Sequence, residues 1–196
     1  AGWGRFQPAP CRVYRPERCD GLQALLDGAA PGPLLARGLG RSYGDTAVNR
    51  LGSVIDMTRL NRMRSFDPET GVLDCEAGVS LSEILDNFVP RGWRPPVLPG
   101  TRLVTVGGAI ANDVHGKSHH CDGSFSAFVE GITLWTPAEG VVECSATQQP
   151  DVFWATVGGI GLTGIILSAR IRLQRVASAY VSVDYLQCAH LDAALD

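Results

Sequence analysis

The chain has 196 residues, of which 45% are hydrophobic and 19% charged, a composition typical of globular rather than disordered proteins. Seventeen basic and 20 acidic residues leave a formal net charge of −3, without the clustered positive charge of a nucleic-acid-binding surface. The longest uncharged apolar run, 157–169, contains glycines and is shorter than the roughly 20 residues that span a bilayer. We therefore predict a globular protein with no nucleic-acid partner and no transmembrane segment.

The N-terminus and the cysteines bear on where the protein works. The first ten residues contain no apolar signal core, although a leader removed before the first residue stays open. The six cysteines, at positions 11, 19, 75, 121, 144 and 188, form no Cys-x-x-Cys pair. A disulfide scaffold would be shorter and richer in cysteine, so we expect free thiols in a reducing compartment. The predicted location is the cytoplasm or the periphery of the cell envelope.

In the first half of the chain, an extended segment over 1–15 is followed by a helix over 16–30, where three leucines form an apolar stripe. Short strands are predicted over 34–36, which we expect to be buried, and over 53–57. A hairpin follows, with strands at 62–66 and 72–76 around an Asp-Pro-Glu-Thr-Gly turn.

Ser80 is the predicted N-cap of a helix that runs to Phe88, because Glu83 stands three residues later, as in a capping box. The rest of the chain is predicted to form strands at 128–136, 140–144, 164–173 and 180–185, and helices at 151–157 and 191–195. The last strand and helix begin where the chain stops, which predicts the start of a further domain.

Glycines dominate the central stretch 98–120. It has too little polar periodicity for a surface helix and too much glycine for an ordinary strand. Glycine lets a backbone approach a ligand closely, so the main chain is expected to meet a ligand at Gly100, Gly107, Gly108 and Gly116. A polar cluster follows: Asp113, His115, Lys117, His119 and His120. This combination suits a flat, partly apolar, phosphate-bearing ligand with chemistry at one edge.

Two further glycine-rich loops, 36–46 and 153–166, flank this stretch in the sequence. The first matches neither a Rossmann turn nor a P-loop, yet its small residues can curl the backbone into a nest of N–H groups for phosphate oxygens. A tight surface loop with Asp45 as a turn residue is the alternative. The loop 153–166 is predicted to contain a helix end, a Gly-Gly turn and the start of a strand. This would place 158–164 beside the same ligand. The alternative is that the loop merely joins two elements of the core.

A metal site is the rival interpretation of the histidine cluster. His115 and His119 are four residues apart, with Asp113 and Asp122 nearby. Metal-binding pairs at that spacing need a helix, and Gly116 disfavours one. We therefore assign no metal ligands, but a metal-dependent hydrolase that uses His115, His119 and His120 remains an alternative.

Together the loops resemble the PCMH-type, or vanillyl-alcohol oxidase, family of FAD-binding domains. The matching segments are A-R-G-L-G-R-S-Y-G-D, V-L-P-G-T-R-x-V-T-V-G-G-A-I-A-x-D-x-H-G-K-x-H-H and F-W-A-T-V-G-G-x-G-L-T-G-I-I. The resemblance is strongest to members that oxidise a lipid-linked ribose. It implies an α+β fold of two subdomains, with an FAD-binding domain at 1–178 and the start of a truncated substrate (cap) domain at 179–196.

The resemblance also implies the cofactor contacts. The first loop would wrap the FAD pyrophosphate, and the central stretch and Ile166 would line the rest of the cofactor. The residues implied are Ala36, Arg37, Gly38, Leu39, Gly40, Arg41, Ser42, Tyr43, Gly44, Asp45, Thr46, Gly100, Thr105, Val106, Gly107, Gly108, Asn112, Asp113, Val114, His115 and Ile166.

Departures from the family pattern concern the flavin linkage and the substrate. Many relatives bind FAD covalently through a histidine of the first loop, where this chain has Arg41, and others through a cysteine that is absent between Cys75 and Cys121. FAD is therefore expected to be non-covalent. Asn112 and Ser118 stand where the resemblance leads one to expect Cys and Asn, which bears on the substrate rather than the cofactor.

The implied reaction oxidises a secondary C–OH of a sugar to a ketone, with hydride passing to the flavin. His115 is the first candidate for the base and Lys117, at the substrate entrance, the second. A purely structural contact of His115 with the cofactor is equally open. The substrate would be a sugar or a polyprenyl-phosphate-linked sugar of cell-wall (arabinogalactan) synthesis, and a reductase or epimerase partner would act on the keto product. A non-catalytic or partner-dependent flavin-binding fragment is the other alternative.

Overall fold

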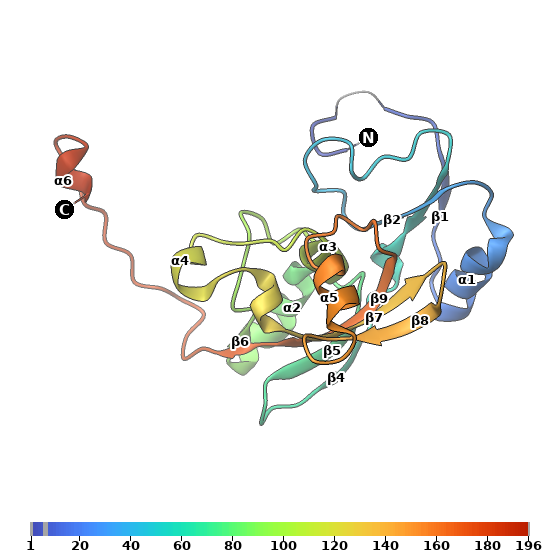
Figure 1. Ribbon diagram of the computed structural model, residues 1–196. Helices are drawn as coiled ribbons and strands as arrows, with labels where there is room; N and C mark the ends of the chain where they lie inside the picture. Colours follow the sequence, from blue (N-terminus) through green and yellow to red (C-terminus); the bar gives the residue numbers. More distant parts are fainter. Residues whose placement is uncertain (1, 6–7, 196) are drawn as a thin grey trace.

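The computed structural model of the chain describes residues 2–5 and 8–195, in which two main sheets have separate hydrophobic cores (Figure 1). The smaller sheet consists of β1 (Arg12–Tyr14), β2 (Leu34–Arg37) and β3 (Ser53–Asp56), parallel and in the order β1-β3-β2. Helix α1 (Cys19–Ala24) continues into a π-helical turn, Leu25–Ala29. Its buried leucines pack with Ile55, Met57 and Leu60 in the smaller core.

The larger sheet has five antiparallel strands in the order β4-β5-β9-β7-β8. These are β4 (Met63–Phe66), β5 (Val72–Glu76), β7 (Val129–Thr136), β8 (Gly140–Cys144) and β9 (Ile165–Arg172). A separate two-stranded ribbon pairs β6 (Trp93–Arg94) with β10 (Gln174–Arg175). The long strand β9 lies between β5 and β7 and is therefore the centre of the sheet.

Three helices pack against the larger sheet and share its core: α2 (Leu81–Phe88), α3 (Val106–Ala111) and α5 (Pro150–Thr156). Each contributes fully or almost fully buried side chains, among them Ile84, Ile110 and Phe153. The remaining helical segments are the 3-10 turns Met57–Arg59, Val89–Arg91 and Phe125–Phe128 and the short helices α4 (His119–Asp122) and α6 (Asp192–Leu195).

Because of a β-bulge, strand β9 contributes side chains to both cores. Leu134 of β7 pairs with Ile166 and the adjacent Thr133 with Ser168, so Leu167 is an extra residue in the ladder. Leu167 packs against the smaller core, whereas Ile166 and Ala169 belong to the larger one. The extra residue shifts the inward and outward alternation of the strand, as bulges do.

Most local predictions are confirmed. The hairpin forms between β4 and β5, and Ser80 and Glu83 make both hydrogen bonds of the capping box. The strand pair around residues 137–139, the helix before Val157 and the long strand β9 also form. The first helix begins at Cys19 rather than at residue 16, and residues 34–36 are half-buried rather than buried. The α+β fold class is confirmed.

One segment, 180–185, differs from expectation. Residues 180–185 do not form the predicted strand, because no strand within the described residues pairs with them. Their side chains are exposed, and Tyr185 is 93% accessible. In Figure 1 this segment leaves the body of the molecule as an extended tail that ends in α6. Within 98–120, where the pattern indicated neither a surface helix nor a strand, the structure has the short buried helix α3.

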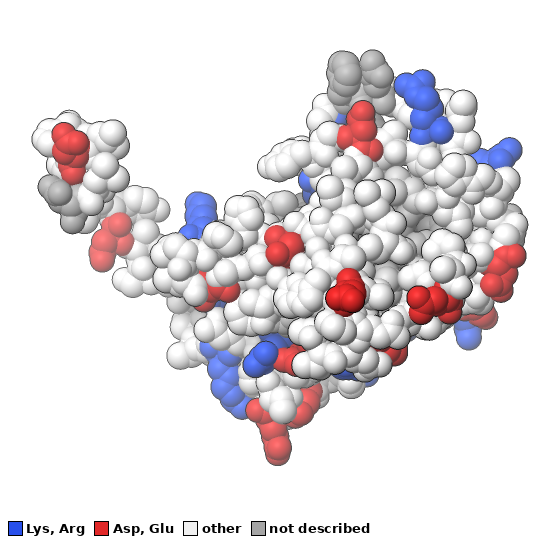
Figure 2. All heavy atoms as spheres, viewed as in Figure 1, with Lys and Arg blue, Asp and Glu red and all other residues white. Residues whose placement is uncertain are grey.

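The surface carries no large patch of one charge on the face shown in Figure 2, where acidic and basic side chains are scattered. No helix in the described part of the chain combines the length and apolar character needed to cross a membrane.

Candidate flavin-binding site

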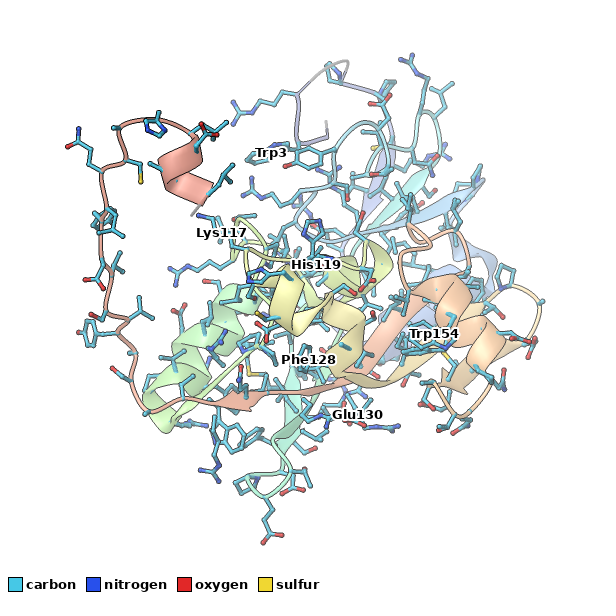
Figure 3. The ribbon with its side chains drawn as sticks, turned by 60° about the vertical axis from the view of Figure 1, so that its left-hand side comes forward. Trp3, Lys117, His119, Phe128, Glu130 and Trp154 are labelled. Atoms are coloured by element: carbon cyan, nitrogen blue, oxygen red, sulfur yellow. The ribbon has the colours of Figure 1, made fainter. Side chains whose placement is uncertain are left out.

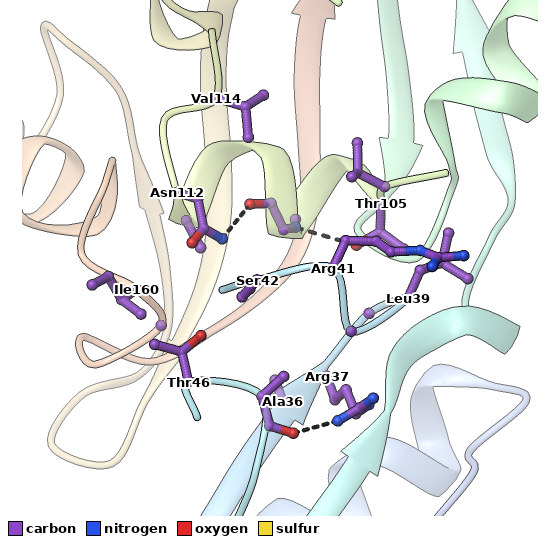
Figure 4. A pocket seen from close by; sticks show the side chains of 18 of the residues that line it. Ala36, Arg37, Leu39, Arg41, Ser42, Thr46, Thr105, Asn112, Val114 and Ile160 are labelled. Carbon is purple, nitrogen blue, oxygen red and sulfur yellow. Dashed lines mark hydrogen bonds between the residues drawn. The ribbon is translucent and has the colours of Figure 1, made fainter. Parts of the chain in front are cut away.

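The main cavity has a volume of about 520 Å³ and is lined by residues of both sheets and their connecting loops (Figure 4). Ligand sites in proteins commonly enclose about 300–1,000 Å³. All three glycine-rich segments reach it. The lining residues are Ala36, Arg37, Gly38, Leu39, Gly40, Arg41, Ser42, Tyr43, Thr46, Ala47, Met57, Ala77, Pro99, Gly100, Val104, Thr105, Gly107, Gly108, Ala111, Asn112, Val114, His115, Ile160, Gly161, Gly164 and Ile166.

The first segment leaves the carboxyl end of β2 and curls along one wall of the cavity. Gly40 and Gly44 have φ values of +64° and +65°, which glycine tolerates far better than other residues. The guanidinium of Arg37 donates a hydrogen bond to the carbonyl of Ala47 and so closes the loop. Residues 36–43 and Thr46 of this loop line the cavity, and its two left-handed glycines give it the tight curvature that a phosphate-binding nest requires.

Helix α3 forms the opposite wall because glycines allow close packing on both of its sides. A Cβ on Gly107 would lie 2.9 Å from the Cβ of Ala77, and one on Gly38 would lie 2.2 Å from Oγ1 of Thr105. Thr105 caps the helix by accepting a hydrogen bond from the Gly108 N–H at 3.2 Å, and the Asn112 side-chain amide donates to the Gly108 carbonyl at 2.8 Å (Figure 4). Loop and helix are thus held in direct contact.

The third segment docks onto the carboxyl end of α3. The N–H groups of Gly158 and Ile160 donate to the carbonyls of Ile110 and Ala111, at 3.1 and 2.8 Å. The backbone then turns through left-handed conformations and enters β9. This docking brings Ile160 and Ile166 to the cavity as apolar lining.

Arg41 lines the cavity and has one hydrogen-bond donor without a partner among the described residues. Its Nε atom is buried and, in the part of the chain that the structure describes, is the one buried side-chain nitrogen or oxygen without a hydrogen-bond partner. The guanidinium lies over the ring of Trp3, with 4.9 Å from its central carbon to the ring centroid. A buried, unsatisfied charged donor is costly, so an acceptor supplied by a bound molecule would complete it.

The two candidate catalytic residues lie in different places. His115 is exposed at the rim and lines the cavity, whereas Lys117 is exposed but not part of the lining. Figure 3 shows Lys117 on the segment before α4 and His119 at the start of that helix. The rings of His115 and His119 are 5.0 Å apart. Of the described residues, no group of three or more His, Cys, Asp or Glu side chains could hold a metal ion.

Most of the predicted cofactor residues line the cavity, but four do not: Gly44, Asp45, Val106 and Asp113. Gly44 and Asp45 are exposed on the loop, Val106 is fully buried in the larger core, and the Asp113 carboxylate binds Ser124 and Ser126. The motifs also missed several lining residues. These are Ala47, Met57, Ala77, Pro99, Val104 and Ala111, whereas Ile160, Gly161 and Gly164 belong to the stretch 158–164 that was predicted beside the ligand.

A comparison with protein families agrees with this geometry. The family model described as FAD binding domain matches residues 10–145. The chain therefore belongs to this FAD-binding family of PCMH type, and FAD is the cofactor of its members. The prediction that FAD is the cofactor is thus confirmed by the family to which the chain belongs.

Individual relatives point to flavin-dependent oxidoreductases. Over 188 residues the chain is 48% identical to decaprenylphosphoryl-beta-D-ribose oxidase of Mycolicibacterium smegmatis, an alignment of 93% of this chain and 41% of that protein. It is 32% identical over 184 residues to cytokinin dehydrogenase 8 of Oryza sativa, covering 85% of this chain and 34% of the relative. The chain thus spans less than half the length of these relatives. Neither is a hydrolase, so the comparisons do not support that alternative.

Proposed function

We propose that this chain binds FAD non-covalently in the main cavity and is the flavin-binding part of an oxidoreductase that oxidises a secondary hydroxyl of a sugar to a ketone. The observation that carries the proposal is the convergence of the three glycine-rich segments on one cavity that contains an unpartnered Arg41 Nε. The 48% identity to a decaprenylphosphoryl-ribose oxidase supports a sugar, specifically a polyprenyl-phosphate-linked pentose, as substrate.

The residues present fit FAD. The first loop offers backbone N–H groups to the pyrophosphate, and Arg41 offers Nε–H to an anionic or carbonyl oxygen of the cofactor. Val114, Ile160 and Ile166 supply the apolar surface for a flat ring system. No histidine stands in the first loop, so the linkage is non-covalent. When bound, FAD supplies a two-electron acceptor for hydride from the substrate carbon.

His115 is the proposed base. An unprotonated ring nitrogen at the cavity rim would accept the hydroxyl proton of the substrate, a role that histidine often has in general acid–base catalysis. Lys117, exposed two residues further on, is the second candidate and would attract an anionic substrate group at the entrance. The alternative role of His115 is a contact with the cofactor without proton transfer.

The proposal extends to the biological setting. A lipid-linked sugar places the reaction in the cytoplasm or at the periphery of the cell envelope, in cell-wall synthesis. A keto sugar is reactive, so a reductase or epimerase is the proposed partner that consumes it. A second candidate function, a flavin-binding fragment that needs further polypeptide for turnover, is favoured by the 41% coverage of the related oxidase.

The test is FAD binding by the purified chain. We expect a visible flavin absorption band, quenching of flavin fluorescence on titration, and complete release of FAD into the supernatant after acid precipitation. A folded protein that takes up no FAD would refute the proposal, and a yellow pellet would refute the non-covalent linkage. Turnover with lipid-linked ribose separates the enzyme from the partner-dependent fragment, which binds FAD without turnover.

Arg41→Ala tests the site itself. A hydrogen bond to a charged group contributes about 1.5–3 kcal/mol, so the variant should bind FAD roughly 10- to 150-fold more weakly. Arg50→Ala is the matched control, because Arg50 is exposed near the same loop and does not line the cavity. Equal FAD affinity of the Arg41 variant and the control would remove Arg41 from the site.

A further inference from the structure

Helix α3 ends in a conformation that favours glycine but carries an aspartate. Asp113 has a φ of +39°. Its N–H donates to the Ile110 carbonyl, and the N–H of Val114 donates to the Ala109 carbonyl, both at 3.0 Å. These two bonds define a Schellman cap with Asp113 at the left-handed position.

Aspartate is unfavourable at this position for two reasons. The left-handed region costs a non-glycine residue about 1–2 kcal/mol, and aspartate occupies it mainly where its side chain forms hydrogen bonds nearby. A carboxylate at the carboxyl end of a helix also opposes the exposed carbonyl dipoles. Glycine would avoid both effects, so the side chain of Asp113 needs a separate physical role.

That role lies in the segment that returns to α3 after α4. One oxygen of the Asp113 carboxylate accepts a hydrogen bond from Ser124 Oγ at 2.8 Å, and the other accepts one from the Ser126 N–H at 3.0 Å. Beside them, the Phe125 N–H donates to the Val114 carbonyl at 2.9 Å, and His115 and Ser124 form an antiparallel bridge. The carboxylate therefore joins the two ends of the segment 115–124.

We infer that Asp113 is a positioning residue: it closes the base of segment 115–124 and thereby holds His115 at the rim of the cavity. The clamp consists of the Asp113 carboxylate with Ser124 and Ser126. Asp113 does not line the cavity, so its effect on the site passes through His115. The role of His115 rests on the proposed function, whereas the clamp itself requires no cofactor.

The sequence supplies a specific probe of the clamp, because Lys117 is its only lysine. A lysine-specific endopeptidase can therefore cut the folded chain at one place, inside the clamped segment. The rate of cutting measures how often the segment opens. Asp113→Gly removes the carboxylate while favouring the left-handed backbone, so it separates loss of the clamp from damage to α3.

We expect Asp113→Gly to be cut at least tenfold faster than the unaltered protein, and Asp113→Asn within about threefold of it, because the amide can accept from Ser126 and donate to Ser124. The rate of cutting of Ser124→Ala should lie between the rates of these two variants. If the glycine variant does not fold, Ser124→Ala is used to test the inference. Gln149→Gly is the matched control: Gln149 is also left-handed, with φ +47°, but its side chain makes no cap. Cutting of Asp113→Gly and Ser124→Ala at the unaltered rate would overturn the inference.

A second measurement follows the His115 ring directly. In the clamped state its imidazole proton signals, assigned with His115→Gln, should differ from those of a free histidine because His119 lies beside it. Asp113→Gly should move them toward the free values, whereas Asp113→Asn and Gln149→Gly should not. Unmoved signals in the glycine variant would contradict positioning by Asp113. Addition of FAD then tests the proposed function separately: absence of FAD binding would refute that function and leave the clamp result standing.

Discussion

Two side chains of this domain occupy positions that are unfavourable for the residues they carry. Arg41 buries a charged donor without a partner, and Asp113 adopts a left-handed backbone. Energetically unfavourable residues of this kind persist where they contribute to function or where other interactions compensate their cost. For Arg41 the offset is an acceptor on a bound molecule, and for Asp113 it is the pair of hydrogen bonds to Ser124 and Ser126. The first concerns the ligand and the second the rim of the cavity.

At the same scale, the burial of the Cys75 thiol predicts that the free energy of unfolding decreases at alkaline pH. Burial on β5 raises the pKa of the Cys75 thiol from 9.0 to about 12. Below pH 9 the thiol is protonated in both states, so its contribution does not change. Between pH 9 and 12 it ionises only when the chain unfolds, so stability falls as pH rises. The loss from this group should be about 1.4 kcal/mol between pH 8 and pH 10.

Urea unfolding at pH 8 and pH 10 measures this effect. Cys75→Ala should be less stable at both values because it leaves a space in the core, but its loss between them should be smaller by about 1.4 kcal/mol. Cys188→Ala, at an exposed thiol, is the control and should show the unaltered loss. An equal pH dependence in all three proteins would contradict the burial of Cys75.

At the scale of elements, helix α3 organises the site although it has only six residues. Its first turn meets the glycine loop after β2, and its carboxyl end accepts hydrogen bonds from the third segment and continues into the clamp at Asp113. The glycines that allow these contacts also lower helix propensity, by about 1 kcal/mol each. The pattern of residues 98–120 therefore did not indicate the helix.

The contact between the first loop and α3 predicts a destabilising effect of Gly38→Ala. The new Cβ would lie 2.2 Å from Thr105 Oγ1, and overpacking of this kind costs about 1–3 kcal/mol. Thr105→Ala removes the N-cap and should itself cost about 1 kcal/mol. Because it also removes the obstructing atoms, the double variant should lose clearly less than the sum of the two single losses, as measured by urea unfolding.

Two controls define this experiment. In the double variant Gly38→Ala/Thr105→Ser the obstructing oxygen remains. Its loss of stability should therefore be close to the sum of the two single losses. Gly4→Ala introduces a methyl group where no atom lies within 4 Å and should leave stability unchanged. Full additivity of Gly38→Ala and Thr105→Ala would show that loop and helix are not in contact.

At the scale of the whole molecule, the two cores form one body because β9 belongs to both, whereas the tail after β10 belongs to neither. The apolar side chains of the tail are exposed, and those of Tyr180, Tyr185 and Leu186 are at least 87% accessible. By contrast, Leu173 is 3% accessible and Arg175 lies over the ring of Trp93 at 4.4 Å. The domain boundary after residue 178 remains a prediction.

Truncation tests this boundary. Removal of 179–196 should leave the melting temperature within about 2 °C and FAD affinity unchanged, because surface changes without buried contacts have small effects. Removal of 173–196 should lower stability by at least about 2 kcal/mol through loss of the buried Leu173. If the shorter truncation also lowered the melting temperature strongly, the tail would be part of the fold.

What the sequence by itself determined were local features and the family. The hairpin around 67–71 and the capping box of Ser80 and Glu83 form as predicted because their signals lie within a few neighbouring residues. The glycine motifs led to the PCMH-type family and to FAD, and the family match confirms both. The roles of His115 and Lys117 remain predictions, since their chemistry involves a substrate.

Only the tertiary structure decided which residues face the cavity and which support it. Asp113 and Val106 belong to the same motif as Asn112 and Thr105, yet their side chains point to the clamp and to the core. The bulge at Leu167 and the unpaired segment 180–185 depend in the same way on partners far away in the sequence. A motif states which residues occur together, but the direction of each side chain follows from long-range packing and hydrogen bonding.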